Sequence, residues 1–145
     1  MEKWKLYAIA AALFAGLTSV VAKAGLKNVS ADLGLAVRTV FVFVFVLLNL
    51  FAWTSPATTT AALKQASSRT YLLLALSALT TTLSWICYHR AMKDGTVAFV
   101  SLVDKGSVLV TLVLSTVLLG EPFTWRLACG AALVVVGLII LMGGN

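Results

Sequence analysis

The 145-residue chain is 61% hydrophobic and only 11% charged, whereas soluble domains are about 45–50% apolar and about 25% charged. A chain this short makes only one small core, so its composition argues against a water-soluble domain and indicates an integral membrane protein. The formal net charge of +6 comes from basic residues scattered singly near the ends of apolar segments. Without a basic run or a recognition motif, this scatter argues against nucleic-acid binding and favours anchoring at anionic membrane lipids.

Five apolar segments are long enough to cross about 30 Å of hydrocarbon as helices. In chain order they cover residues 5–25, 31–53, 71–92, 96–119 and 123–142. Their apolar runs are continuous and lack the alternation of membrane-barrel strands. The sequence therefore predicts an all-α integral membrane protein, with residues 1–145 forming a single domain of five transmembrane helices.

The ends and connections of these segments carry weaker signals. Lys3 and Lys5 before the first segment resemble the start of a signal peptide, but we expect this segment to be retained as a membrane helix. Residues 54–70 are rich in Thr, Ser and Ala and are predicted to form a solvated loop. The sequence Gly120-Glu121-Pro122 predicts a tight turn, with Pro122 in the first turn of the fifth helix.

The basic residues do not fix the orientation of the chain in the membrane. With a cytoplasmic N-terminus, the residues inside are Lys3, Lys5, Lys64, Arg69 and Arg126. The residues on the other side are Lys23, Lys27, Arg38, Arg90 and Lys93. Counting Lys23 and Arg38 as intramembrane leaves only a weak preference for this orientation. Two alternatives follow: a single orientation, or insertion both ways round to form an antiparallel dimer of inverted copies.

Two opposite charges, Asp104 and Lys105, lie inside the fourth apolar segment. A charge at the centre of a bilayer costs roughly 2.5–3.5 kcal/mol on insertion scales, so such residues usually face a protein interior or a wet cavity. Arg38 and Asp104 are expected roughly 9 Å and 12 Å from the same membrane face, and Arg38 or Lys23 are the expected partners of Asp104. Lys105 is expected about 100° further around the helix. The pattern favours a functional site over a purely structural ion pair.

Hydroxyl side chains follow helical spacing on the third and fourth segments. Ser77, Thr81, Ser84 and Tyr88 share one face, and Ser101, Asp104, Thr111 and Ser115 share another. These faces either line a polar path or hold helices together through hydrogen bonds. The candidate substrate- or ion-binding residues are Asp104, Lys105, Arg38, Lys23, Tyr88, Trp85 and Ser84.

A series of short motifs runs along essentially the whole chain. They are Phe14-Ala15-Gly16, Lys23-Ala24-Gly25-Leu26, Arg38, Trp85-Ile86-Cys87-Tyr88-His89-Arg90-Ala91-Met92-Lys93, Asp104-Lys105-Gly106-Ser107-Val108, Leu118-Leu119-Gly120-Glu121-Pro122, Gly130 and Gly137. In order and spacing they resemble one EamA-type unit of the drug/metabolite transporter superfamily, particularly its small five-helix members. Larger relatives contain two such units in inverted orientation, and usually carry a proline-centred motif where this chain has Asp104-Lys105. The resemblance implies one inverted-repeat unit of a transporter that works by alternating access.

We therefore expect a secondary transporter of a small metabolite or drug in the inner membrane of the cell. The expected partners are its small-molecule substrate, membrane lipids, and a second five-helix chain in a homodimer or heterodimer. The alternative is a non-transporting accessory or scaffold subunit of a membrane complex, such as a lipid-carrier flippase. No nucleophile–base pair, metal-ligand spacing or phosphate-binding loop is present, so we expect no enzymatic activity, catalytic residue, metal or cofactor.

Overall fold

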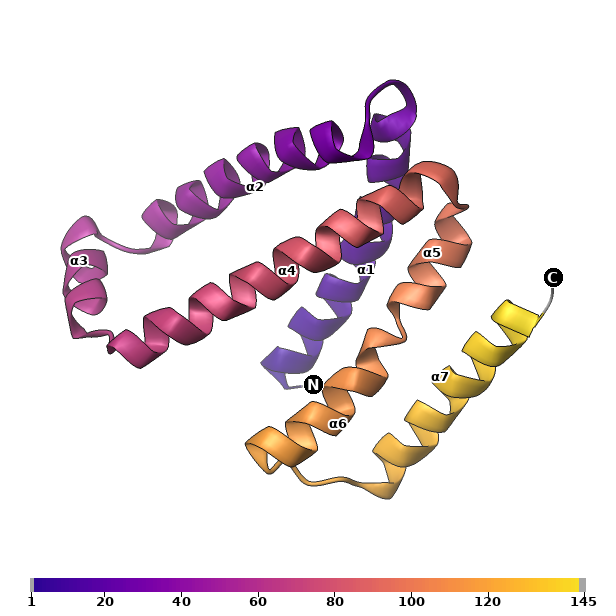
Figure 1. Ribbon diagram of the computed structural model, residues 1–145. Coiled ribbons are helices and arrows are strands. Elements are labelled where there is room, and N and C mark those ends of the chain that lie inside the picture. Colours follow the sequence, from indigo (N-terminus) through magenta and orange to yellow (C-terminus); the bar gives the residue numbers. More distant parts are fainter. Residues whose placement is uncertain (1, 144–145) are drawn as a thin grey trace. The chain divides into compact units, whose positions relative to one another are not determined.

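The computed structural model describes residues 2–143, and within this range the chain is helical and has no strand. Its elements are α1 (Lys3–Gly25), the 3₁₀ turn η1 (Leu26–Asn28), α2 (Ala31–Trp53), α3 (Pro56–Gln65), α4 (Ser68–Asp94), α5 (Val97–Asp104), α6 (Ser107–Leu119) and α7 (Trp125–Gly143), as Figure 1 shows. Counting α1 with η1 and α5 with α6, five helical segments of the described chain are long and apolar enough to cross a membrane. The predicted all-α, five-helix membrane fold is confirmed.

Polar residues at the helix starts explain where several of these elements begin. The Ser30 hydroxyl accepts a hydrogen bond from the Leu33 amide at 3.2 Å and caps α2. The Thr96 hydroxyl caps α5 by accepting a hydrogen bond from the Phe99 amide at 3.3 Å. The Thr124 hydroxyl caps α7 by accepting one from the Leu127 amide, also at 3.3 Å. Each cap satisfies one of the backbone N–H groups that a helix N-terminus leaves without an internal partner.

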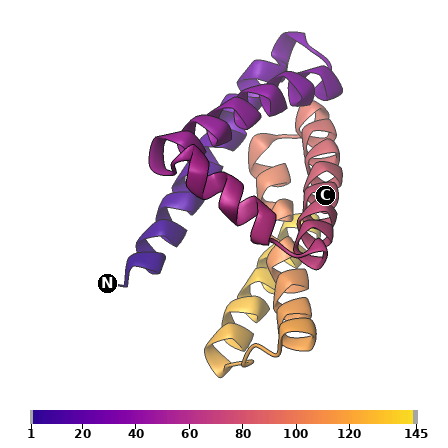
Figure 2. The same ribbon diagram turned by 90° about the vertical axis from the view of Figure 1, so that its left-hand side faces the viewer.

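A short helix replaces the predicted loop between the second and third spans. Ser55 accepts a hydrogen bond from the Thr58 amide, and Pro56 occupies the start of α3, where its missing N–H is harmless. The Tyr71 hydroxyl donates to the Leu63 carbonyl at 2.5 Å and ties α4 to α3. Figures 1 and 2 show α3 linking the end of α2 to the start of α4. The loop prediction was wrong because it relied on composition and overlooked the Ser-Pro start signal.

The chain divides into two compact units, Ala24–Lys93 and the combination of Met1–Lys23 with Asp94–Asn145. In the unit Ala24–Lys93, the end of α4 is fastened to the turn that precedes α2. The Lys93 ammonium group donates to the carbonyls of Leu26 at 2.6 Å and Val29 at 2.8 Å. Gly34 in the first turns of α2 lies against the buried Leu26 side chain, with no room for a Cβ atom.

In the other unit, α7 runs back antiparallel to α5 and α6 and contacts both (Figure 1). The reversal begins at Gly120, whose φ of 68° is the left-handed conformation that glycine adopts most easily. Pro122 lies in the non-helical link before α7 and not, as predicted, in its first turn, because the helix starts only after the Thr124 cap. The Lys23 ammonium group donates to the Gly95 carbonyl at 3.0 Å.

Few side chains are buried within the described chain. The buried residues of the described chain are Leu26, Leu35, His89, Met92 and Val100. The large apolar side chains along α1, α2, α4, α6 and α7 are mostly exposed. Such surfaces are stable only in contact with lipid or with another protein chain, as a membrane-spanning bundle requires.

Candidate functional site

The fourth span is broken at the charged pair, where a continuous helix was predicted. α5 ends at Asp104 and α6 begins at Ser107. The Gly106 amide donates to the Val103 carbonyl at 2.9 Å, and the Val108 amide donates to Lys105 at 3.1 Å. These three-residue hydrogen bonds replace the four-residue bonds of an α-helix, a local tightening that often marks a hinge or a functional site. The sequence signal for the break is the glycine that directly follows the two charges.

Asp104 and Lys105 form an ion pair with each other at this break. The Lys105 ammonium lies 3.4 Å from a carboxylate oxygen of Asp104, and the two side chains are 58% and 38% exposed, respectively. Both charges lie between the C-terminal end of α5 and the N-terminal end of α6. Because these adjacent helix ends carry opposite partial charges, each side chain is balanced chiefly by the other.

An apolar pocket of about 470 Å³ lies beside the break, between α5 and α7. Its lining residues are Leu102, Lys105, Leu133, Val134, Gly137, Leu138, Ile140 and Leu141. Pockets for small molecules commonly enclose about 300–1,000 Å³ and combine apolar walls with a few polar groups. Here the polar group is Lys105. The arrangement can therefore bring an apolar ligand of modest size next to the charged pair.

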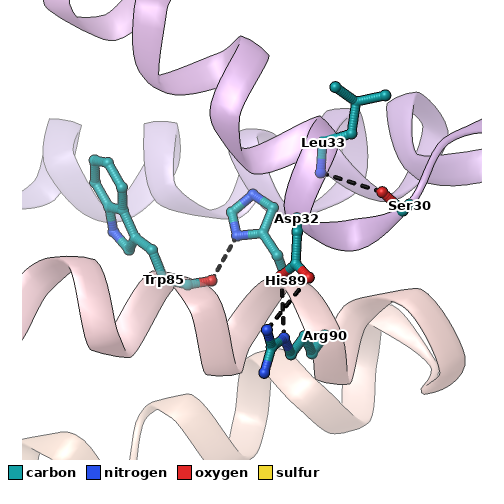
Figure 3. A network of polar contacts seen from close by, with 6 residues as sticks. All are labelled: Ser30, Asp32, Leu33, Trp85, His89 and Arg90. Carbon is teal, nitrogen blue, oxygen red and sulfur yellow. Dashed lines mark hydrogen bonds and ion pairs between the residues drawn. The ribbon is translucent and has the colours of Figure 1, made fainter.

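A second group of polar side chains lies between α2 and α4, in the unit Ala24–Lys93. The Arg38 guanidinium carbon lies 4.6 Å from the centre of the Trp85 ring, a cation–π contact between two half-buried side chains. The Trp85 carbonyl in turn accepts a hydrogen bond from Nδ1 of His89 at 2.9 Å (Figure 3). The Tyr88 ring meets the His89 ring edge-on at 5.9 Å.

Next to this group, an ion pair joins the end of α4 to the start of α2. Nε and Nη2 of Arg90 donate to the two carboxylate oxygens of Asp32 at 3.0 and 3.2 Å (Figure 3). Both side chains are 64% exposed, so the pair adds little stability by itself. Its two parallel hydrogen bonds join the end of α4 to the start of α2.

Comparison with known proteins identifies the family. Residues 2–143 match the model of the EamA-like transporter family. The chain belongs to this family. A relative from Sinorhizobium sp, described as "Uncharacterized transporter in cobO 3'region", is 32% identical over 143 residues, which cover 97% of this chain and 96% of the relative. No solved structure matches the chain significantly. The resemblance seen in the sequence is confirmed: this EamA-like protein is a multi-pass membrane transporter.

The structure of this EamA-like protein brings some of the predicted site residues together. Arg38 contacts Trp85, and Asp104 pairs with Lys105. Lys23, expected near Asp104, holds the Gly95 carbonyl. Of the remaining two, Tyr88 packs against His89, and Ser84 is exposed on α4. No contact by itself assigns a role, so the binding roles of all these residues stay predictions.

Three hydroxyl groups of the two faces form hydrogen bonds within their own helices. Thr81 donates to the Ser77 carbonyl at 2.8 Å, Thr111 to Ser107 at 3.1 Å, and Ser115 to Leu112 at 3.3 Å. Such bonds to a preceding turn remove the need for a partner on another helix. The same hydroxyl oxygens can still accept a further hydrogen bond. Both interpretations of these faces therefore remain: they line a polar path, or they form hydrogen bonds with another helix.

Sequence reasoning left one residue of each unit out of the candidate set. His89 lies one turn after Trp85, and this spacing of four residues places both on one face of α4. Gly106 packs closely enough that a Cβ atom would meet the Val103 carbonyl at 3.0 Å and Leu138 at 3.2 Å. The spacing signal was available for His89, whereas the proximity of Gly106 to α7 required the fold.

Proposed function

We propose that this EamA-like protein is a secondary transporter that moves a small metabolite or drug across the inner membrane by alternating access. The functional unit is an antiparallel dimer of two copies or of two similar chains. The observation that carries the proposal is the broken fourth span, with Asp104 and Lys105 at the break and an apolar pocket beside it.

The break supports this function because it places a charged pair within a membrane span, where such residues usually mark a substrate or ion pathway. In many transporters, substrate and coupling-ion sites lie near the middle of the bilayer and are built from discontinuous helices. Asp104 is the eighth residue of α5, which places it roughly 12 Å along a span of about 30 Å. Asp104 is therefore the group that pairs with a substrate or coupling ion, and Lys105 is its resting partner.

Two features support the antiparallel dimer: the distribution of basic residues, and the apolar side chains that the five spans leave exposed. The basic residues are almost evenly divided between the two faces of the membrane, so they give little directional bias during insertion. Five spans are one half of an inverted-repeat transporter, and the second half is supplied by a copy inserted the other way round.

The first test is a set of substitutions at the break. We expect Asp104→Asn to lower transport by about tenfold or more, because a hydrogen bond to a charged group contributes about 1.5–3 kcal/mol. Transport is measured with everted membrane vesicles and a metabolite extract of the expression host, followed by mass spectrometry. Asp94→Asn, at the exposed end of α4, is the matched control and is expected to transport like the wild type.

A double variant separates a functional Asp104 from a structural ion pair. Asp104→Asn with Lys105→Met removes both charges and leaves neither unpaired. If the double variant transports like the wild type, Asp104 has no role in binding. If the wild type accumulates nothing but purifies with an unlike membrane protein in equal amounts, the chain is an accessory subunit.

A further inference from the structure

The apolar pocket between α5 and α7 has a single charged group in its wall. Of the described residues that line it, Lys105 is the only one that is neither aliphatic nor glycine. Asp104, which forms the ion pair with Lys105, is not among these lining residues. A ligand that fills this space therefore packs its body against aliphatic side chains and meets a positive charge at one place.

The Lys105 ammonium can bind such a ligand because its ion pair with Asp104 is weak. An ammonium group carries three N–H donors, and Asp104 accepts from one of them at 3.4 Å. Strong hydrogen bonds between an ammonium and a carboxylate are shorter, about 2.7–2.9 Å. The Lys105 side chain is also 58% exposed, so the described chain does not cover it. An incoming anion can therefore take the ammonium over from Asp104.

The position of Lys105 within the span argues against a phospholipid as the occupant of the pocket. Lys105 follows the eight residues of α5, which extend about 12 Å at 1.5 Å per residue. A phospholipid carries its phosphate at the face of the membrane, at the edge of about 30 Å of hydrocarbon. An anion that reaches Lys105 therefore belongs to a small molecule that enters the span.

We propose that the pocket binds an amphipathic organic monoanion, with its negative group on Lys105 and its apolar body against α7. One ammonium balances one negative charge, which favours a carboxylate over a phosphate ester carrying about two charges. Asp104 displaces the ligand by pairing with Lys105 again. That the ligand is a transported substrate rests on the proposed function, whereas its binding in the pocket stands independently of it.

A glycine in the wall of the pocket makes the proposal testable without disturbing the charged pair. Gly137 lines the pocket on α7, and a Cβ atom there meets nothing within 4 Å. Gly130 lies on the same helix and has the same open space, but it does not line the pocket. Gly137→Leu and Gly130→Leu are therefore a matched pair, of which only the first fills the site.

Binding of ¹⁴C-octanoate to the purified protein in lipid nanodiscs tests the ligand class, with protein-free nanodiscs as the background. Octanamide and octylammonium compete with the same apolar chain but are neutral and positively charged. We expect octanoate to compete about tenfold better than either, because a hydrogen bond between two charged groups is the strongest of the three. Equal competition by octanamide or octylammonium overturns the proposal, as does a wild-type protein that binds no octanoate.

Substitutions then locate the site. We expect Gly137→Leu and Lys105→Gln each to weaken octanoate binding about tenfold or more, whereas Gly130→Leu binds like the wild type. Lys105→Arg keeps the positive charge and should keep most of the affinity. Asp104→Asn removes the competing carboxylate and should strengthen binding about threefold or more. Gly137→Leu keeps the test decisive if the loss of Lys105 impairs folding, and wild-type binding by this variant overturns the proposal.

The vesicle assay with the metabolite extract separates this inference from the proposed function. Wild-type vesicles that move no metabolite overturn the proposed function, and octanoate binding then still decides which ligand class the pocket takes. Metabolite transport by a protein that binds no octanoate overturns the inference about the pocket alone.

Discussion

Arg38 and Asp104 show two different ways of keeping a charge within an apolar segment. The Arg38 guanidinium lies over the face of Trp85, where the electron density of the ring offsets the positive charge without a carboxylate. Asp104 is balanced by the adjacent Lys105. The first arrangement joins two helices, whereas the second is local to one span. Substitutions at the two sites should therefore have different effects.

A double-mutant cycle measures the contact between Arg38 and Trp85. We expect Arg38→Met and Trp85→Leu to be coupled by about 0.5–2 kcal/mol, the range for cation–π contacts from exposed to desolvated sites. Unfolding in mixed detergent micelles with increasing dodecyl sulfate gives the free energies. The exposed pair Trp4 and Lys5, with the ammonium 5.2 Å from the ring centre, is the control and should show weaker coupling. Equal coupling in both pairs would contradict the structure.

At the scale of elements, the close contact between η1 and α2 depends on a glycine. A Cβ atom at Gly34 would overlap the side chain of the buried Leu26. We expect Gly34→Ala to lower the free energy of unfolding by about 1–3 kcal/mol, as overpacking usually does. Gly16→Ala is the matched control, because a Cβ there has nothing within 4 Å and alanine favours helix. The same micelle titration measures both, and a neutral Gly34→Ala would mean that the Leu26 side chain can move aside.

The predicted bounds were accurate for the membrane spans. They were inaccurate for α3 and for the break between α5 and α6, where short local signals decide the structure. The spans predicted at 31–53 and 71–92 correspond to α2 (Ala31–Trp53) and α4 (Ser68–Asp94), because length and apolarity alone define them. The helix α3 was missed because its Thr-rich composition masked a Ser-Pro start. The break after Asp104 was missed because the residues on both sides are apolar enough to form one continuous span, although Asp104, Lys105 and Gly106 interrupt the apolar run.

The candidate site was predictable as a set of residue types but not as a set of contacts. An ionisable pair within an apolar segment made Asp104 and Lys105 candidates from sequence alone, and their binding role stays a prediction. The contact of Arg38 with Trp85 joins residues far apart in the chain, and no spacing rule links them. The spacing of His89 from Trp85 was visible in the sequence, but the burial of His89 is a property of the fold.

At the scale of the whole molecule, the proposed dimer makes a prediction about orientation. Lys64 lies on the exposed helix α3, which connects two spans. With Cys87→Ala and Cys129→Ala as background, Lys64→Cys in intact cells is treated with a membrane-impermeant thiol reagent. If copies insert both ways round, as the nearly balanced charges suggest, about half of the molecules should react.

Permeabilised cells provide the control, because every molecule must then be labelled. Labelling of all or none of the molecules in intact cells would rule out an antiparallel dimer of identical chains. The inverted half would then have to come from a different protein, and co-purification would be the next experiment.

The break in the fourth span also bears on how the chain is made. At 1.5 Å per residue, the eight residues of α5 and the 13 residues of α6 extend about 12 Å and 20 Å, and neither alone crosses about 30 Å of hydrocarbon. During synthesis this span enters the bilayer with two charges and with a turn of three-residue hydrogen bonds between its halves. Its stabilising neighbour α7, joined through the left-handed turn at Gly120, leaves the ribosome later. We expect the fourth span to settle in the membrane only when the C-terminal hairpin is complete.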